Sequence, residues 1–400
     1  MSYTPKNIPN GWALKKMPDV VKWSSGGTPK ATEKSYYENG TIPWLIIGDL
    51  NDGVVTTSAS KITELGLQNS SAKMIPVGTL LVAMYGSIGK LGITGIECCT
   101  NQAIAYAKEL KGVSTKYMYY YMAMMKSELI SQGKGGTQKN ISQTVLNSLE
   151  VLVPPEKEQK RIVNKIEELF SELDSAVETL KKTKEQLAVY RQSVLKDAFE
   201  REKDGKFLKI KDFANVGTGA TPLKTRQDYY NGDIAWVSSG KVNDKKIYTP
   251  TAYITEKALE ETNCSVYPAH TIVVAMYGEG KTRGQCAELM IDAATNQALA
   301  AIVLQDNSVI CKDFLLWFLT LNYEELRRKA AGGVQPNLNL NLVKNISIPY
   351  YDMDTQTKII SEIESKLTVC ENIEKTANDA LIQADAMRQS ILKKAFEGEL

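Results

Sequence analysis

The sequence predicts an α+β fold made of two tandem β-rich domains, each followed by one long helix. The 400 residues exceed what one hydrophobic core of ordinary size needs, so at least two domains are expected. A set of short motifs occurs twice in the same order, and a heptad pattern follows each set. We therefore expect domains at 1–155 and 204–352, with long helices at 156–203 and 353–400.

The division into two similar halves is inferred from an internal repeat in the sequence. Four motifs define it, and we name them here: the Thr-Pro loop (Gly-x-Thr-Pro, 26–29 and 219–222), the Tyr-Gly turn (Val-Ala-Met-Tyr-Gly, 82–86 and 274–278), the Asn-Gln loop (Thr-Asn-Gln-Ala, 100–103 and 295–298) and the Gly-Gly segment (Gly-Gly-x-Gln-x-Asn, 135–140 and 332–337). A Tyr-Tyr pair and a tryptophan follow each Thr-Pro loop, at Tyr36, Tyr37 and Trp44 and at Tyr229, Tyr230 and Trp236. Self-similarity in a fixed order indicates a duplicated structural unit.

The domains are predicted to be mixed α and β. Short apolar or β-branched runs bounded by Gly, Pro, Asn or Asp are typical of strands. We expect strands at 43–48, 79–84, 149–153, 235–238, 271–276 and 346–348, and short helices at 116–130 and 312–329.

The long helices are predicted from their spacing of apolar residues. From 156 to 200 there is no Pro or Gly, and apolar residues recur at steps of four and three. This heptad period indicates a coiled-coil helix of roughly 67 Å. The predicted pairing residues are Ile162, Ile166, Leu169, Leu173, Leu180 and Leu187 in the first helix, and Ile359, Ile363, Ile373, Met387 and Ile391 in the second.

The second helix has alanines in the middle of its seam, which would let a bulkier helix approach closely. The two helix ends also match almost letter for letter, at 191–200 and 388–397. We therefore expect the two helices of one chain to pair as an antiparallel coiled coil with pseudo-twofold symmetry. Homodimerisation of the chain is the alternative.

Several classes of site are disfavoured. The one histidine, His270, follows Tyr-Pro-Ala and is expected in a turn before a strand, with a lone acid or base as the alternative. The cysteines lack zinc or Cys-x-x-Cys spacing, so reduced, packed thiols are expected and no metal. No helicase, methylation or clustered nuclease motif is present, and the chain is expected to be non-catalytic and to need no cofactor. The absence of a long apolar run or a signal peptide predicts a cytoplasmic protein without membrane contact.

Charge and motif chemistry make a polyanion a candidate ligand. Basic residues outnumber acidic ones in the domains, and acidic residues prevail in the helices. Each Tyr-Gly turn is followed by glycines and basic residues, among them Lys90 in the first copy and Lys281 and Arg283 in the second; the turn either faces DNA or is a plain hairpin. In the Gly-Gly segments, Gln138 and Gln335 either contact bases or phosphates or fix a turn.

Taken together, these features resemble the specificity subunit of type I restriction-modification systems. The resemblance covers essentially the whole chain and rests on the domain–helix order, the Thr-Pro and Gly-Gly motifs, the helix entry Pro154-Pro155 with Gln159 and Ile162, and the ending 390–400. Two features depart from exact symmetry: the segments between matched motifs differ, and Lys366 stands where the first helix has a leucine.

The resemblance implies a DNA-recognition function. Two target recognition domains would each read one half of a bipartite, asymmetric target in double-stranded DNA, and the helices would set the spacer. The expected partners are two modification (methyltransferase) subunits and the restriction (translocase/nuclease) subunits. The implied DNA-binding residues are Lys30, Lys34, Tyr85, Lys90, Gln138 and Lys139 in the first copy, and Lys224, Arg226, Tyr277, Lys281, Arg283 and Gln335 in the second.

Two other function classes are open. A coiled-coil scaffold joining two protein-binding modules would differ only in its ligand, and a nucleotide-dependent enzyme would bind ATP or S-adenosylmethionine. The segment at 278–282 lacks the first glycine of a phosphate-binding loop, because Ala275 stands at that position.

Overall fold

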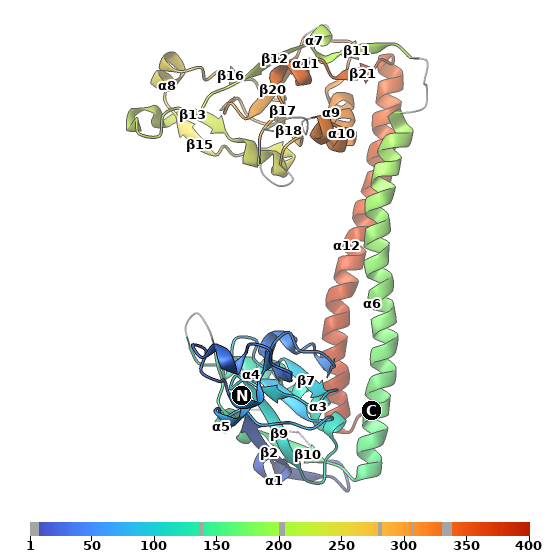
Figure 1. Cartoon of the computed structure of the whole chain (residues 1–400). Coiled ribbons are helices and arrows are strands. Elements are labelled where there is room, and N and C mark those ends of the chain that lie inside the picture. Colours follow the sequence, from blue (N-terminus) through green and yellow to red (C-terminus); the bar gives the residue numbers. More distant parts are fainter. Residues whose placement is uncertain (1–7, 136–138, 200–204, 279–281, 306–307, 330–337) are drawn as a thin grey trace. The chain divides into compact units, whose positions relative to one another are not determined.

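The computed structural model describes residues 8–135, 139–199, 205–278, 282–305, 308–329 and 338–400. The chain divides into two compact units: unit 1 is 1–180 with 378–400, and unit 2 is 181–377. Each unit holds one β-rich domain and one end of each long helix, α6 (Glu156–Phe199) and α12 (Met353–Glu397) (Figure 1). The predicted α+β fold with two tandem domains, each followed by a long helix, is confirmed.

The domain of unit 1 contains three small sheets. A five-stranded sheet has the order β2-β9-β6-β7-β4, a second has the order β5-β3-β8, and β1 pairs with β10. The strands are β1 (Ala13–Lys16), β2 (Val21–Ser25), β3 (Ile42–Leu45), β4 (Gly53–Val55), β5 (Lys61–Ile62), β6 (Leu80–Ala83), β7 (Leu91–Thr94), β8 (Cys99–Thr100), β9 (Ile104–Leu110) and β10 (Glu150–Val153); the helices are α1 (Met17–Val20), α2 (Glu64–Gln68), α3 (Thr115–Met124), α4 (Lys126–Ser131) and α5 (Gln143–Asn147), with 3-10 turns at Lys34–Tyr36 and Ile47–Asp49.

The domain of unit 2 repeats this plan, with one additional strand in its second sheet, β16. Its sheets have the orders β12-β20-β17-β18-β14 and β15-β13-β19-β16, and β11 pairs with β21. The strands are β11 (Phe207–Lys209), β12 (Ala214–Thr218), β13 (Tyr230–Val237), β14 (Lys246–Ile247), β15 (Ala252–Ile254), β16 (Val266–Tyr267), β17 (Ile272–Ala275), β18 (Cys286–Leu289), β19 (Ala293–Thr295), β20 (Leu299–Leu304) and β21 (Ser347–Pro349); the helices are α7 (Ile210–Phe213), α8 (Glu256–Glu261), α9 (Lys312–Leu321), α10 (Tyr323–Lys329) and α11 (Leu340–Lys344), with 3-10 turns at Gln227–Tyr229 and Ser239–Asp244.

The repeat extends to backbone conformation. Asn39 and Asn231 occupy equivalent turns with φ of 60° and 61°, a left-handed conformation that asparagine tolerates better than most residues. The predicted strands all exist, with boundaries shifted by a few residues. Each predicted short helix is instead two helices, broken at Met125 and at Asn322. At the second break, the Asn322 amide donates to the Phe318 carbonyl at 2.8 Å, which ends α9.

Each domain shares its core with the long helices. In unit 1, one face of the five-stranded sheet packs with α3 against Ile162 and Ile166 of α6 and Phe396 of α12. In unit 2, the equivalent core joins β17 and α9 to Phe199 of α6 and Ile363 of α12. The start of α6 thus lies beside the end of α12 in unit 1, and the end of α6 lies beside the start of α12 in unit 2, so the two helices pair antiparallel.

The structure corrects part of the predicted helix seam. Ile162, Ile166, Leu187, Ile359 and Ile363 are buried, and Leu169, Leu173, Leu180 and Ile391 are half-buried. Ile373 and Met387, however, expose 42% and 54% of their surface. Their neighbours Glu374 and Arg388 are half-buried instead. At these two positions of α12 the seam therefore lies one residue later than predicted.

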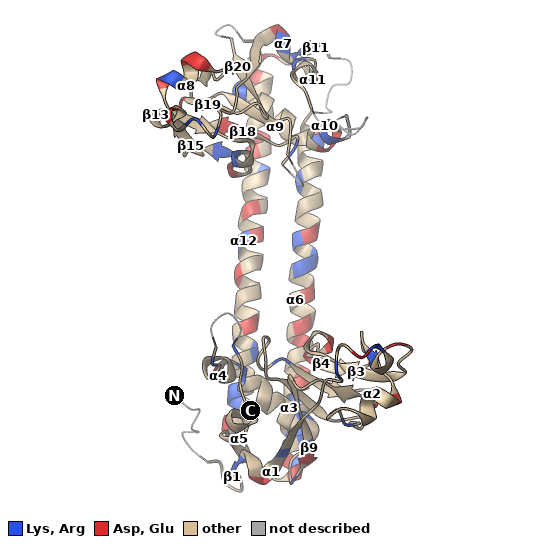
Figure 2. Cartoon of the chain, turned by 60° about the vertical axis from the view of Figure 1, so that its left-hand side comes forward, with Lys and Arg blue, Asp and Glu red and all other residues tan. Residues whose placement is uncertain are grey.

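Charge pairing explains this displacement. Lys, Arg, Asp and Glu are distributed along both helices (Figure 2). In unit 2, Arg191 of α6 pairs with Glu374 of α12 at 2.8 Å, and in unit 1 Arg388 of α12 pairs with Asp174 of α6. The apolar pattern favours Ile373 and Met387 over Glu374 and Arg388. In the structure, the charged side chains cover the seam with their apolar stems and form ion pairs at its edge.

The remaining sequence predictions concern single residues. His270 lies in the turn before β17 with φ of 69°, as expected, and its Nδ1 lies 2.8 Å from Glu288 Oε1. All cysteines are free thiols, and four of them are buried: Cys98, Cys99, Cys264 and Cys370. Burial raises the pKa of Cys98 to about 11, so this thiol stays protonated. Among the described residues, no helix is long and apolar enough to cross a membrane.

Candidate functional site

The Thr-Pro loop of unit 1 is anchored by the aromatic residues that follow it in the sequence. The Trp44 indole donates to the Gly27 carbonyl at 3.0 Å, and the Tyr37 hydroxyl donates to the Pro29 carbonyl at 2.5 Å. Tyr37 and Trp44 contact each other edge to face, with ring centroids 6.1 Å apart. Burial raises the pKa of Tyr37, so its hydroxyl remains a donor.

The same anchors occur in unit 2. The Trp236 indole donates to the Ala220 carbonyl at 3.0 Å, and the Tyr230 hydroxyl donates to the Pro222 carbonyl at 2.6 Å. The repeated tyrosines and tryptophans therefore fix the backbone of the Thr-Pro loop in both units.

The Thr-Pro loop lies directly on the Asn-Gln loop, and glycine makes this approach possible. A Cβ added at Gly26 would lie 1.9 Å from the Thr100 carbonyl oxygen, and one at Gly219 would lie 1.7 Å from the Thr295 carbonyl oxygen. No side chain fits at such a distance. Thr100 and Thr295 are fully buried, and their hydroxyls have no hydrogen-bond partner in the part of the chain that the structure describes.

Side chains also link these two loops. The Thr28 hydroxyl donates to Oε1 of Gln102, and the Thr221 hydroxyl donates to Oε1 of Gln297 at 2.6 Å. Gln102 and Gln297 are both exposed. These glutamines were not among the predicted site residues, although the motif that contains them was found by its repetition.

The Tyr-Gly turn lies beside the Asn-Gln loop. In unit 1, the Met84 N–H donates to the Ala103 carbonyl at 2.8 Å, and the Ile141 N–H donates to the Met84 carbonyl at 2.9 Å. In unit 2, the Met276 N–H donates to the Ala298 carbonyl at 2.7 Å. Backbone hydrogen bonds thus join the Asn-Gln loop to the Tyr-Gly turn in both units, and the threonine–glutamine hydrogen bonds join the Asn-Gln loop to the Thr-Pro loop. The next residues, Tyr85 and Tyr277, are 41% and 36% exposed.

Comparison with known proteins gives this duplicated assembly a family. The sequence model of the family described as "Type I restriction modification DNA specificity domain" matches residues 9–188 and, a second time, residues 202–383. The chain belongs to this family. It carries two specificity domains in tandem, each covering one β-rich domain and part of a long helix.

Two relatives match this type I specificity protein along nearly its whole length, and a third matches less than half of it. The MjaIX specificity subunit of Methanocaldococcus jannaschii is 29% identical over 98% of this chain and 94% of the relative. The StySPI specificity subunit of Salmonella potsdam is 22% identical over 98% of this chain and 90% of the relative. The EcoR124I/EcoR124II specificity subunit of Escherichia coli is 28% identical over 42% of this chain.

Solved structures confirm the fold of this specificity protein. One comes from work on the complex assembly and conformational transition of the type I R-M system; it covers 99% of this chain and 100% of its own, with a TM-score of 0.79 at 15% identity. The HsdS subunit of Thermoanaerobacter tengcongensis covers 99% of both chains, with a TM-score of 0.62 at 16% identity.

The basic residues expected to bind DNA have different surroundings in this specificity protein. Lys30, Lys34, Lys139 and Lys224 are exposed and form no ion pair within the described residues. Lys90 is half-buried, with Nζ 3.5 Å from the Ile47 carbonyl, and Arg283 is half-buried in the turn between β17 and β18. Gln138, Lys281 and Gln335 lie outside the described residues.

Arg226 is already paired. Its guanidinium donates to both carboxylate oxygens of Asp228, at 2.8 and 2.7 Å, and to Glu261 at 3.1 Å, and it lies 4.4 Å from the Tyr229 ring centroid. The hydrogen bonds from Arg226 and Lys257 hold the pKa of Asp228 well below its usual range. A phosphate would have to compete with these carboxylates for Arg226.

A buried glutamine at the start of each long helix connects that helix to its domain. Gln159 accepts from the Ser114 N–H at 2.9 Å and donates to the carbonyls of Gly112 and Pro154, at 2.8 and 3.1 Å. Gln356 accepts from the Cys311 N–H at 2.7 Å and donates to the carbonyls of Val309 and Tyr351, at 2.7 and 2.8 Å. These two clamps position the specificity domains on their helices.

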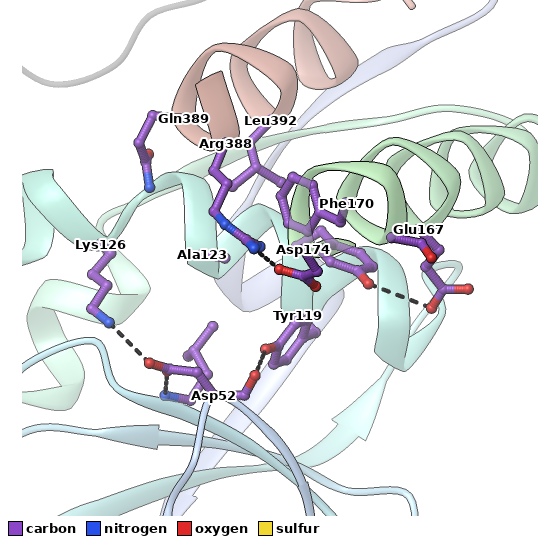
Figure 3. A pocket seen from close by; sticks show the side chains of 13 residues that line it. Asp52, Tyr119, Ala123, Lys126, Glu167, Phe170, Asp174, Arg388, Gln389 and Leu392 are labelled. Atoms are coloured by element: carbon purple, nitrogen blue, oxygen red, sulfur yellow. Dashed lines mark hydrogen bonds and ion pairs between the residues drawn. The ribbon is translucent and has the colours of Figure 1, made fainter. Parts of the chain in front are cut away.

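Unit 1 also has a polar pocket of about 490 Å³ where its domain meets the two helices (Figure 3). Asp52 pairs with Lys126 at 3.2 Å, and its carbonyl accepts from the Tyr119 hydroxyl. Arg388 pairs with Asp174 and lies 5.0 Å from the Phe170 ring centroid. Burial, and then the negative charge of Asp52, raise the pKa of Tyr119 to about 12. Because these charges pair with each other, the pocket joins domain and helices and offers little to an ionic ligand.

Proposed function

We propose that this chain is the DNA sequence-recognition subunit of a type I restriction-modification complex and has no catalytic site of its own. The observation that carries the proposal is the duplicated assembly of the Thr-Pro loop, Asn-Gln loop and Tyr-Gly turn in two domains of the specificity family. The named relatives are specificity subunits, which supports a recognition role.

The two domains would read two different half-sites of double-stranded DNA. The shared motifs build one frame, while the residues between them differ, and different side chains on the same frame favour different base sequences. Segments 26–34 and 85–90 would face one half-site, and segments 221–226 and 277–283 the other. In this proposal, residues 1–155 and 204–352 are the target recognition domains, and 156–203 and 353–400 are the spacer helices.

Partner subunits would supply the chemistry. Two modification subunits would dock on the chain and methylate adenine, and restriction subunits would join to move and cleave DNA. The exposed lysines Lys30, Lys34, Lys139 and Lys224 support contact with phosphates, since unpaired cations on a domain surface neutralise a polyanion.

The test is to produce the chain with its modification subunits and to map methylated adenines in DNA exposed to the complex. We expect one bipartite motif with two different halves and a fixed gap. Exchanging residues 1–155 for the equivalent domain of a relative should change one half only. Methylation independent of sequence, or protein ligands captured by both domains without DNA binding, would instead support a scaffold.

The spacer function has its own experiment. Deleting seven residues from each long helix shortens it by about 10 Å, which corresponds to about three base pairs of duplex. We expect a shorter preferred gap, lower affinity because the groove phase changes, and unchanged half-sites. An unchanged gap would show that the helices do not set the spacing.

A further inference from the structure

The Asn-Gln loops present the same two amide side chains in both units. Asn101 and Gln102 follow β8, and Asn296 and Gln297 follow β19. In each pair the asparagine is half-buried and the glutamine is exposed.

The oxygen atoms of these amides are engaged within the protein. Oε1 of Gln102 accepts from Thr28, and Oε1 of Gln297 accepts from Thr221 at 2.6 Å. Oδ1 of Asn101 accepts from the Ala103 N–H at 3.1 Å, and Oδ1 of Asn296 accepts from the Ala298 N–H at 3.2 Å.

The NH₂ groups, in contrast, are available. Within the described residues, those of Asn101, Gln102, Asn296 and Gln297 have no hydrogen-bond partner. Each Asn-Gln loop therefore presents free N–H donors, while each amide oxygen already accepts one hydrogen bond from within the protein.

These donors sit on a rigid support. The Gly27 N–H donates to the Thr100 carbonyl at 2.8 Å, and the Asn101 N–H donates to the Leu45 carbonyl at 3.0 Å. In unit 2, the Asn296 N–H donates to the Val237 carbonyl at 3.0 Å. A fixed loop loses little conformational entropy when it binds, so its hydrogen bonds contribute fully to affinity.

Identity across the two units indicates what the donors bind. Residues that read bases should differ between domains that read different half-sites, whereas residues that contact features common to all duplexes can be the same. The sugar–phosphate backbone is common to both half-sites, and its phosphate oxygens are acceptors only. An amide whose oxygen is occupied also loses much of the donor–acceptor pattern with which Gln reads adenine.

We propose that Gln102 and Gln297, oriented by Thr28 and Thr221, form one uncharged phosphate-binding position in each domain, which holds the DNA backbone without reading sequence. The proposal rests on the proposed DNA-recognition function. Lys30 and Lys224 lie close in sequence to the two threonines and are exposed, which adds charge attraction on the same loop.

The test compares Gln102→Ala and Gln297→Ala with the unchanged protein, each assembled with its modification subunits, on duplexes with the correct target and on unrelated duplexes. We expect each substitution to weaken binding to both kinds of DNA by about fivefold, as for the loss of one or two hydrogen bonds. The dependence of affinity on salt should stay unchanged because no charge is lost, whereas Lys30→Ala should reduce it. Gln102→Glu, which places a negative charge by the phosphate, should weaken binding more than Gln102→Ala.

Two controls make the outcome decisive. Gln305→Ala removes an exposed glutamine just beyond the far end of β20 and should leave affinity unchanged. Thr28→Val keeps Gln102 but frees its amide to rotate, and should cause a smaller loss than Gln102→Ala. Unfolding curves of all variants should coincide with that of the unchanged protein.

The results separate this inference from the proposed function. If the unchanged complex binds no DNA, both fail. If it binds a specific target and Gln102→Ala either has no effect or relaxes the preference at one base position, the proposed function stands and the phosphate-binding position is wrong.

Discussion

The two units have the same framework but stabilise it differently. Tyr119 and Tyr120 of α3 pack against the core of unit 1 and also line its polar pocket. The equivalent residues of α9 in unit 2, Leu316 and Trp317, pack against the core as well but carry no hydroxyl group. In unit 2, the buried carboxylate of Glu288 bonds Lys312 and His270, while the equivalent position of β7 in unit 1 is Ile93.

This difference teaches which positions the fold requires. Glycines at the loop contact, the buried glutamine clamps and the aromatic anchors are the same in both units, so they belong to the framework. Among the described residues, Leu316 and Trp317 replace the two pocket tyrosines in unit 2, and Ile93 replaces Glu288 in unit 1, so the same fold forms without these polar groups. Substitutions at equivalent positions can therefore show which contacts stabilise both units and which stabilise only one.

The largest expected effect is at the aromatic contacts between each domain and a long helix. Phe396 lies 5.0 and 5.5 Å from the ring centroids of Tyr117 and Tyr121, and Phe199 lies 4.9 and 5.5 Å from those of Phe314 and Phe318. Phe396→Ala and Phe199→Ala should each cost about 4 kcal/mol of unfolding free energy, because both rings are buried.

Hydrogen exchange followed by mass spectrometry measures where this stability is lost. Phe396→Ala should speed exchange in unit 1 and Phe199→Ala in unit 2. Equal loss of protection in both units after either change would contradict the separation of the two cores.

The second largest effect is expected at Gln159 and Gln356, the buried glutamines that connect each long helix to its domain. Gln159→Ala and Gln356→Ala should each cost about 3 kcal/mol, because one buried N–H and two carbonyls lose their partner. The two costs should agree, as measured by denaturant unfolding. A cost below about 1 kcal/mol in one unit would mean that water replaces the amide there.

Acid should affect the two units differently. Burial raises the pKa of Glu288, but hydrogen bonds from Lys312 and His270 outweigh it and hold the pKa below its usual range. The carboxylate then stabilises unit 2 above the ordinary glutamate pKa of about 4.3, and this stability is lost as pH falls through the lower pKa of the folded protein.

Glu288→Gln is the matched variant for that experiment. It should cost about 1.5 kcal/mol at neutral pH by removing charge-assisted hydrogen bonds, and it should abolish the extra acid sensitivity of unit 2. Exchange rates of β17 and β18 against those of β6 and β7, followed as pH is lowered, provide the measurement. A parallel response of both strand pairs in the unchanged protein would contradict the assignment.

The smallest effect concerns the ion pairs between the helices. Arg191→Ala should cost about 0.5 kcal/mol, since pairs this exposed are screened by water. Arg388→Ala should cost slightly more, because the guanidinium also contacts the Phe170 ring. Thermal unfolding at low and high salt measures both costs. The part of each cost that comes from the ion pair should decrease at high salt, whereas the part that comes from the contact of Arg388 with Phe170 should not.

The sequence was sufficient for the architecture because its signals are local and repeated. Strand-like runs, helix period and the order of motifs all follow from neighbouring residues. The seam was predicted one residue early at Ile373 and Met387, since a rule based on apolarity does not anticipate the pairing of Glu374 and Arg388.

The candidate site was predicted less well. The basic residues were found by charge, but charge alone does not reveal that Arg226 is held by Asp228 and Glu261. Gln102 was overlooked because its distinguishing feature is an orientation imposed by Thr28, which lies far away in the chain. The repetition of the Asn-Gln loop does indicate that Gln102 and Gln297 are equivalent positions, but it does not reveal how their amide groups are oriented.

The division of the chain between the units has a consequence for biosynthesis. Unit 2 is continuous, at 181–377, while the core of unit 1 needs Leu392, Ala395 and Phe396 from near the C-terminus. A ribosome therefore releases all of unit 2 before the first domain receives its last core side chains, the reverse of the usual N-terminal-first order. A premature stop codon shortly after residue 377 would leave unit 2 complete, whereas unit 1 would lack the core side chains of 392–396.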